Sequence, residues 1–132
     1  MSYLIDTDII IYSLKNNKQV TVNFGAHRNS PKSLSVVTYG ELIYGARKSK
    51  NVEKNLGITH RIAELFPIIP ISPAIMETFG DTKASLEKTG IVIDDLDLLI
   101  ASTALTHNLI LVTNNEKHFR RIRGLEIENW AT

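Results

Sequence analysis

The sequence contains no cysteine, so disulfide bonds, thiolate catalysis and zinc sites built from cysteine are excluded. It also has no apolar run that approaches the ~20 residues of a membrane-spanning helix. The apolar stretch at the N-terminus is interrupted by Asp6 and Asp8, and it lacks the basic segment that opens a signal peptide. A chain without cysteine suits a reducing compartment. We therefore expect a cytoplasmic protein with no membrane attachment.

The sequence also lacks an excess of charge of either sign, since 15 lysines and arginines face 14 acids and the formal net charge is +1. This balance is not the strongly basic signature of a general nucleic-acid-binding protein. The charges are nevertheless clustered: Asp94, Asp95 and Asp97 form an acidic segment, and residues 117–123 are basic. An acidic pocket within a basic surface would suit a metal site that acts on a polyanion. Scattered, solvated charge is the alternative interpretation.

Strand-like and helix-like segments alternate along the chain, which has the length of one domain covering residues 1–132. Short apolar runs predict strands at 3–5, 33–37, 68–71, 109–112 and 125–127. Helical spacing predicts helices at 9–15, 20–29, 51–65, 73–88, 95–107 and 116–122, with another that begins after Thr38. This alternation predicts an α/β fold with a mainly parallel sheet and helices on both faces.

Capping residues mark several of the predicted helix ends. Thr7 or Asp8 is expected to cap the first helix. Thr38 is the expected N-cap of the helix after the second strand, and Glu41 stands three residues later, at the capping-box position. Asn108 is the expected C-terminal cap of the helix 95–107.

Polar residues at the strand ends are the candidate site, because ligands of a parallel sheet bind beyond the carboxyl ends of its strands. Asp6 directly follows the first strand, and Glu41 lies one turn into the helix after the second. Asp97 lies in the first turn of the helix 95–107, and Asn115 follows the strand 109–112. The topology predicts that these four side chains project into one rim.

Three carboxylates and one amide form an all-oxygen ligand set, which suits Mg²⁺ or Mn²⁺. Such a site supports phosphodiester hydrolysis, because the metal activates a water and neutralises charge on the phosphate. Thr113 is an expected auxiliary that could hydrogen-bond an acid or a phosphate. The four histidines share no metal-ligand spacing, and we expect them at the surface or at helix ends. Among the bases, Arg120, Arg121 and Arg123 are expected to hold phosphate.

Each candidate also has a purely structural interpretation. Asp6 could be an N-cap, Glu41 a capping-box acid and Asp97 a partner of the helix dipole. Asn115 could be an ordinary turn residue. For Asp95, helix capping is favoured over catalysis. No one of these signals is specific, and their joint occurrence at strand ends carries the hypothesis.

Four segments resemble the PIN-domain family and, within it, the VapC-type toxins of toxin–antitoxin pairs. They span nearly the whole chain and occur in the family's order: YLIDTDIIIY, SVVTYGELIYGARKS, DDLDLLIASTAL and LVTNNEKHFRRIRGLEIENW. The resemblance implies a PIN-like three-layer fold with a mainly parallel central sheet flanked by helices. Residues 50–75 are the part of the chain that matches least.

The resemblance also implies a role for each candidate. Asp6 and Asp97 match the two principal metal-binding aspartates, and Glu41 matches the family's glutamate. Asn115 matches a fourth site where many relatives have aspartate, so the amide lowers the negative charge by one and leaves the number of bound metals open. Asp95 matches a position that is acidic in only some relatives, and it is therefore an auxiliary candidate.

The implied function is a Mg²⁺- or Mn²⁺-dependent endoribonuclease that hydrolyses RNA phosphodiester bonds. Its implied partners are a cognate antitoxin, which would block the active-site groove, and a second copy of the chain in a homodimer. Two alternatives stay open. Asp6-Thr7-Asp8 is also the D-x-D pattern of phosphatases that use an aspartyl nucleophile, and a non-catalytic binding module could keep the same fold.

Overall fold

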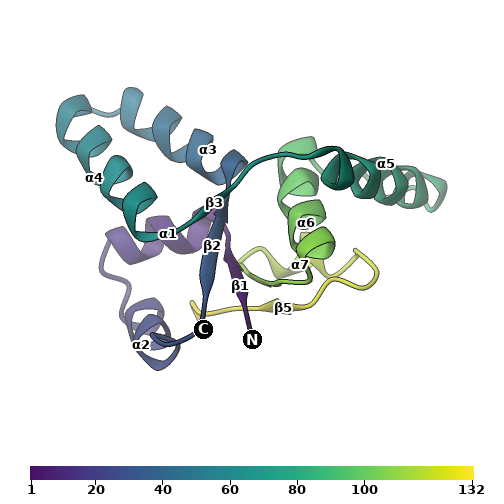
Figure 1. The fold of residues 1–132 in the computed structure, drawn as a ribbon, viewed down its shortest axis with the longest axis horizontal. Helices are drawn as coiled ribbons and strands as arrows, with labels where there is room; N and C mark the ends of the chain where they lie inside the picture. The colour runs from purple at the N-terminus through teal and green to yellow at the C-terminus, as the bar shows by residue number, and fades with distance from the viewer.

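A parallel sheet of five strands forms the centre of the protein in the computed structural model, which describes all 132 residues (Figure 1). The strand order is β3-β2-β1-β4-β5, and every neighbouring pair is parallel. The strands are β1 (Tyr3–Ile5), β2 (Lys32–Ser35), β3 (Ile68–Ile69), β4 (Ile110–Val112) and β5 (Ile127–Glu128). The predicted α/β class and the parallel sheet are confirmed.

Seven helices cover the two faces of this sheet. They are α1 (Thr7–Leu14), α2 (Lys18–Ala26), α3 (Val36–Arg47), α4 (Val52–Leu65), α5 (Pro73–Lys88), α6 (Asp95–His107) and α7 (Glu116–Phe119). Figure 1 shows α3 paired with α4 on one side of the strands, and α5 with α6 on the other. None of these helices has the length and apolarity needed to cross a bilayer.

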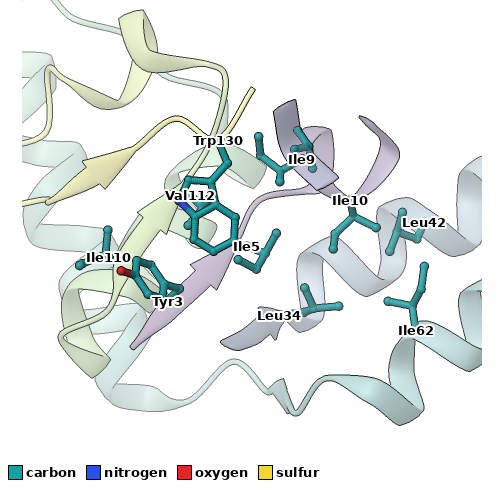
Figure 2. Close-up of a cluster of buried hydrophobic side chains, with 11 residues drawn as sticks. Tyr3, Ile5, Ile9, Ile10, Leu34, Leu42, Ile62, Ile110, Val112 and Trp130 are labelled. Carbon is teal, nitrogen blue, oxygen red and sulfur yellow. The ribbon is translucent and has the colours of Figure 1, made fainter. Parts of the chain in front are cut away.

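The alternation of side chains along β1 divides the buried apolar residues into two clusters. Tyr3 and Ile5 face a cluster that includes Trp130 and residues of α1 to α4 (Figure 2). Leu4 faces the opposite cluster, with Leu111 of β4 and residues of α5, α6 and the segment around α7. All three residues of β1 are buried, which explains why this strand is uniformly apolar in the sequence. Both clusters hold β1 and β4 firmly side by side.

The N-terminal cap of α1 agrees with one of the sequence interpretations, and the cap of α3 does not. Asp6, for which an N-cap role was the structural interpretation, caps α1 and accepts the Thr7 backbone N–H at 2.8 Å. Thr7 and Asp8, the other expected caps, do not cap this helix. The prediction that Thr38 caps the next helix is wrong, because Ser35 accepts the Val37 N–H at 3.1 Å and α3 begins three residues earlier. Strand β2 therefore ends at Ser35 instead of residue 37.

Later helix ends agree better with the sequence. Asn108 ends α6 in the left-handed conformation with φ 55°, as its capping role requires. Helix α6 has the predicted bounds, but its N-cap is Asp94, which accepts the Leu96 N–H at 3.2 Å. The expectation that Asp95 caps this helix is therefore wrong. Helix α7 is shorter than predicted and ends at Phe119, and β5 begins two residues later than expected.

Candidate active site

Asp6 is the most buried of the candidate acids, with 6% of its surface exposed. It follows β1 directly, and its backbone N–H donates to the Val112 carbonyl at the end of β4 at 2.9 Å. This pairing brings the next residue of each strand together. The Thr113 hydroxyl accordingly donates to Asp6 Oδ2 at 2.8 Å, while Oδ1 caps α1. The two adjacent strand ends therefore hold both oxygens of the Asp6 carboxylate in place.

Asp8 lies beside Asp6, although its position in the sequence indicated only a helix cap or part of the D-x-D alternative. Its Oδ2 accepts the Asn114 backbone N–H at 3.1 Å, from the segment that follows β4. Its Oδ1 is buried and has no hydrogen-bond partner. A buried carboxylate oxygen without a donor is costly in the metal-free protein, so this atom is suited to a cation.

Asp97 approaches the same rim from the first turn of α6. Its Oδ2 lies 3.6 Å from His118 Nδ1, and the Asn115 side-chain nitrogen lies 3.0 Å from that same ring nitrogen. Asn115 is itself held by its backbone N–H, which donates to the Thr113 hydroxyl at 3.0 Å. A chain of contacts therefore connects Asp97 through His118, Asn115 and Thr113 to Asp6. His118 lies at a helix end, as expected, but its contact with Asp97 had no signal in the sequence.

Glu41 lies in the second turn of α3, and the structure links it to Asp6 indirectly. Its Oε1 accepts the Thr7 hydroxyl at 2.7 Å, and Thr7 directly follows Asp6 in the chain. The buried Thr38 hydroxyl lies 3.0 Å from the Thr7 hydroxyl. Thr38 is thus part of the polar contacts around the site, and Glu41 is not a capping-box acid.

Asp95 is directed away from these side chains. It forms an exposed ion pair with Lys83 of α5 at 2.9 Å. Of the sequence candidates, Asp6, Asp97, Asn115 and Thr113 are joined by short contacts, Glu41 is joined through Thr7, and Asp95 lies outside the set.

The electrostatics of the site are those of crowded, desolvated acids. Burial raises the pKa of Asp6 to about 7, and repulsion from Asp8 and, more weakly, from Asp97 adds to the rise. Burial also raises the pKa of Asp8, against the hydrogen bond from Asn114. The pKa of Asp97 is raised by burial too, although its hydrogen bond with His118 opposes the rise. No lysine or arginine forms an ion pair with any of these three carboxylates.

This donor set fits a divalent cation in chemistry and in charge. No three histidine, aspartate or glutamate side chains are arranged to enclose an ion by themselves. Mg²⁺ does not require such an enclosure, because it commonly binds through one or two carboxylates and keeps several of its waters. The raised pKa values and the unpartnered Asp8 Oδ1 both indicate negative charge that the protein's own cations leave uncompensated.

An open groove of about 610 Å³ runs beside this site. Its lining combines polar groups near the acids with apolar and aromatic surface: Thr7, Ile11, Val37, Glu41, Tyr44, Lys48 and Leu96 are among the residues that form it. Ile11, Tyr44 and Leu96 are exposed. The groove therefore offers an apolar surface that leads to the edge of the carboxylate cluster.

Comparison with known proteins gives a consistent result over almost the full length. The PIN domain model matches residues 3–125. "Ribonuclease VapC2" of Haemophilus influenzae is 34% identical over 131 residues, which are 99% of each chain. "tRNA(fMet)-specific endonuclease VapC" of Shigella flexneri is 34% identical over 132 residues, again 99% of each chain.

Solved structures are equally similar. VapBC2 from Rickettsia felis, bound to a DNA fragment from its promoter, contains a chain with a TM-score of 0.92 and 36% identity, covering 98% of this chain and 99% of that one. DNA-bound VapBC from Salmonella typhimurium gives a TM-score of 0.91 at 30% identity, covering 98% of both chains. The likeness extends over every element that carries a candidate acid.

Proposed function

The chain belongs to the PIN-domain family, and on that premise we propose that it is a Mg²⁺- or Mn²⁺-dependent endoribonuclease, the toxin of a toxin–antitoxin pair. The observation that supports a metal site is that Asp6, Asp8 and Asp97 lie near one another beyond the carboxyl end of the central strand β1. No lysine or arginine forms an ion pair with them. We also infer that residues 1–132 act as a single domain, because both hydrophobic clusters share the same sheet.

The proposed metal-binding residues are Asp6, Asp97 and Glu41, together with Asp8. When bound, a divalent ion supplies an activated water and neutralises charge that develops on the phosphate. Thr113 orients Asp6 through its hydroxyl, and Thr7 orients Glu41. Fixing the direction of a ligating carboxylate in this way commonly changes metal affinity by about 10–100-fold.

Asn115 and His118 act on Asp97 in this proposal. In the tautomer with its hydrogen on Nδ1, the His118 imidazole donates toward Asp97 Oδ2 and restricts the carboxylate to one orientation. The Asn115 side chain contacts the same ring nitrogen and is an alternative partner for it. At the fourth position Asn115 supplies a neutral group where an acid would add negative charge. The total charge of the site therefore favours one tightly bound divalent ion over two.

The proposal is tested by incubating purified protein with total cellular RNA in Mg²⁺ or Mn²⁺, with an EDTA arm. We expect discrete fragments that disappear in EDTA and in Asp6→Asn and Asp97→Asn variants. The matched control is Asp95→Asn, which removes an acid from the same helix turn as Asp97 but leaves the site untouched. Undiminished cleavage by a folded Asp97→Asn protein would refute the assignment.

A cognate antitoxin is the proposed protein partner, since the similar solved structures are VapBC complexes. The groove beside Glu41 is the proposed place of inhibition, because a segment lying along Ile11 and Tyr44 would cover the edge of the carboxylate cluster. A homodimer is proposed from the family alone. Co-expression of the chain with its partner should suppress RNA cleavage, and Tyr44→Asp should weaken that suppression without lowering cleavage by the free protein.

The two alternatives have less support. An aspartyl-nucleophile phosphatase would need a lysine near the phosphate, and neither Asp6 nor Asp8 has one as an ion-pair partner. A non-catalytic module would give no reason for a buried, mutually repelling set of acids. A Mn²⁺ titration separates the module from the enzyme, because a protein that binds the ion is stabilised in proportion to the logarithm of its concentration.

A further inference from the structure

The basic segment at 117–123 divides into paired and unpaired side chains. His118 lies against Asp97, and the Arg120 guanidinium donates to Glu116 Oε1 at 2.7 Å. Arg121 and Arg123 form no ion pair with any carboxylate, and both are exposed. Of the three arginines expected to hold phosphate, only Arg121 and Arg123 are therefore kept as candidates. Arg120 is set aside because its guanidinium already binds Glu116.

These two arginines project from a firmly anchored turn. Phe119, which precedes both arginines, and Ile122, which lies between them, are 0% and 3% exposed and belong to the hydrophobic cluster shared with α5 and α6. The Ile122 N–H donates to the Phe119 carbonyl at 3.1 Å. Gly124, with φ +83°, then turns the chain in a conformation that a side chain disfavours. Because Ile122 points inward, its neighbours on both sides are directed outward on a rigid support.

Arg121 and Arg123 line one cavity of about 530 Å³ together with the second half of α5. Figure 1 shows this part of α5 on the same side of the molecule as the segment that follows α7. The α5 side supplies the hydroxyl side chains of Thr82 and Ser85 and one carboxylate, Asp81. Thr89 also lines the cavity, but its hydroxyl donates to the Leu86 carbonyl at 2.9 Å. The cavity therefore combines two guanidinium groups that form no ion pair and two hydroxyl donors, with a single acid opposing them.

We propose that this cavity is an exosite for the RNA backbone, binding a phosphodiester group other than the one that is cleaved. The inference rests on the proposed ribonuclease function, and none of the residues lining the cavity is among the proposed metal-binding residues. Guanidinium forks bind phosphate oxygens bidentately, and hydroxyl groups complete such sites. The exosite would also offset a repulsion, because the uncompensated acids of the proposed metal site repel RNA before the metal is bound.

The substrate class follows from this arrangement. The exosite is formed by α5 and the turn after α7, whereas the proposed metal-binding acids come from the residues after β1 and from helices α3 and α6. An RNA that contacts both places must extend beyond the cleaved junction, because the two places share no lining residue. The enzyme should therefore discriminate in favour of long or folded RNA through binding, and short oligonucleotides should lose this contribution.

The test measures binding of unfractionated transfer RNA to the wild-type protein in EDTA across a range of salt concentrations. EDTA removes divalent ions, so the RNA is not cleaved and the proposed metal-binding acids still repel it. Under these conditions the exosite should contribute most of the binding. We expect the Arg121→Gln/Arg123→Gln variant to bind about 10-fold or more weakly, with a log–log salt slope shallower by about 1.5. The matched control, Arg28→Gln/Arg47→Gln, removes the same charge from exposed arginines elsewhere that also form no ion pair and should leave the slope unchanged.

Asp81→Asn provides a test in the opposite direction. Removing the acid that lines the cavity should tighten RNA binding by about 3-fold, and it keeps the proposal falsifiable if the arginine variant folds poorly. Equal slopes for the wild type and the folded arginine variant would overturn the exosite. The exosite would also be overturned if the arginine variant bound RNA as the wild type does but had a different mass in sedimentation. That result would mean that the cavity contacts another protein chain. Metal-dependent cleavage by the wild type is measured separately, so that its absence refutes the proposed function without deciding the exosite.

Discussion

Replacing Asp6 with asparagine is expected to stabilise the metal-free protein while removing its ribonuclease activity. The reason is the environment of the carboxylate, which is 6% exposed, lies near Asp8 and has no cationic partner. Burial and repulsion raise the pKa of Asp6 from 3.8 to about 7. Holding Asp6 ionised above that pH therefore costs folding free energy, and an amide at the same position avoids the cost.

The magnitude follows from the shift. A rise of about three pKa units corresponds to about 4 kcal/mol of unfolding free energy at alkaline pH. The amide must rearrange one hydrogen bond, because its N–H group replaces an oxygen that accepts from Thr113 or Thr7, and this costs about 1–2 kcal/mol. A net gain of about 2 kcal/mol remains, which raises the Tm of a domain of this length by about 5–10 °C.

The pH dependence has a definite sign. Between about pH 4 and pH 7 the folded protein binds a proton at Asp6 that the unfolded chain has lost, so the free energy of unfolding falls as pH rises. This decline should be shallower in the Asp6→Asn variant, where only Asp8 and Asp97, whose pKa values are also raised, still contribute to it. Thermal melts in EDTA across this range, compared with Asp95→Asn as a control for charge, measure both the gain and its pH profile.

Metal binding should reverse the order of stability. Saturating Mn²⁺ should stabilise the wild type, because the proposed site neutralises its acids with the ion, and Asp6→Asn should gain much less from it. The reasoning would be refuted if Asp6→Asn were less stable than the wild type at pH 8 in EDTA, or if its free energy of unfolding fell as steeply with pH. Either result would show that ionised Asp6 does not destabilise the fold.

Three further changes probe the contacts around this carboxylate. Thr113→Val removes the hydroxyl donor to Asp6 and should lower Mn²⁺ affinity about 10-fold in a calorimetric titration, since the fixed carboxylate orientation is lost. His118→Ala should lower cleavage by about 10-fold or more through the freed Asp97 while leaving the Tm in EDTA unchanged, because His118 is exposed; an equal fall in Tm would indicate a structural role instead. Asn108→Gly should raise the Tm by about 1–3 °C, since the left-handed φ of 55° suits glycine better than asparagine, and a lower Tm would show that the asparagine side chain stabilises the α6 terminus.

The architecture could be predicted because each signal for it is local. The apolar run of β1, the alternation of strand and helix segments and the left-handed cap at Asn108 all follow from neighbouring residues. The N-cap of α3 was predicted wrongly because local signals did not distinguish two candidates. Two capping residues, Ser35 and Thr38, stand three positions apart, and only the packing that buries Thr38 at 0% exposure decides between them.

The site was predictable at the level of topology and not at the level of contacts. That Asp6 and Thr113 face each other follows from their positions directly after two strands, once β1 and β4 are adjacent. Sequence patterns carry no information on which strands are adjacent, nor on the 3.6 Å approach of His118 to Asp97 across α7 and α6. The direction of Asp95 toward Lys83 depends likewise on how α5 packs against α6.

The identity of residue 115 connects these contacts to the number of metal ions. The Asn115 amide and the Asp97 carboxylate converge on the same His118 ring nitrogen, at 3.0 Å and 3.6 Å. An aspartate at position 115 would compete with Asp97 for that imidazole and would add charge to a set of acids that already repel one another. A single ring nitrogen either accepts from the Asn115 amide or, in the tautomer with its hydrogen on Nδ1, donates toward Asp97. The amide adds no negative charge and forms the weaker competitor, so it leaves His118 available to orient Asp97. We therefore propose that the neutral fourth position and the histidine both favour a single metal ion, held by an Asp97 carboxylate of fixed orientation.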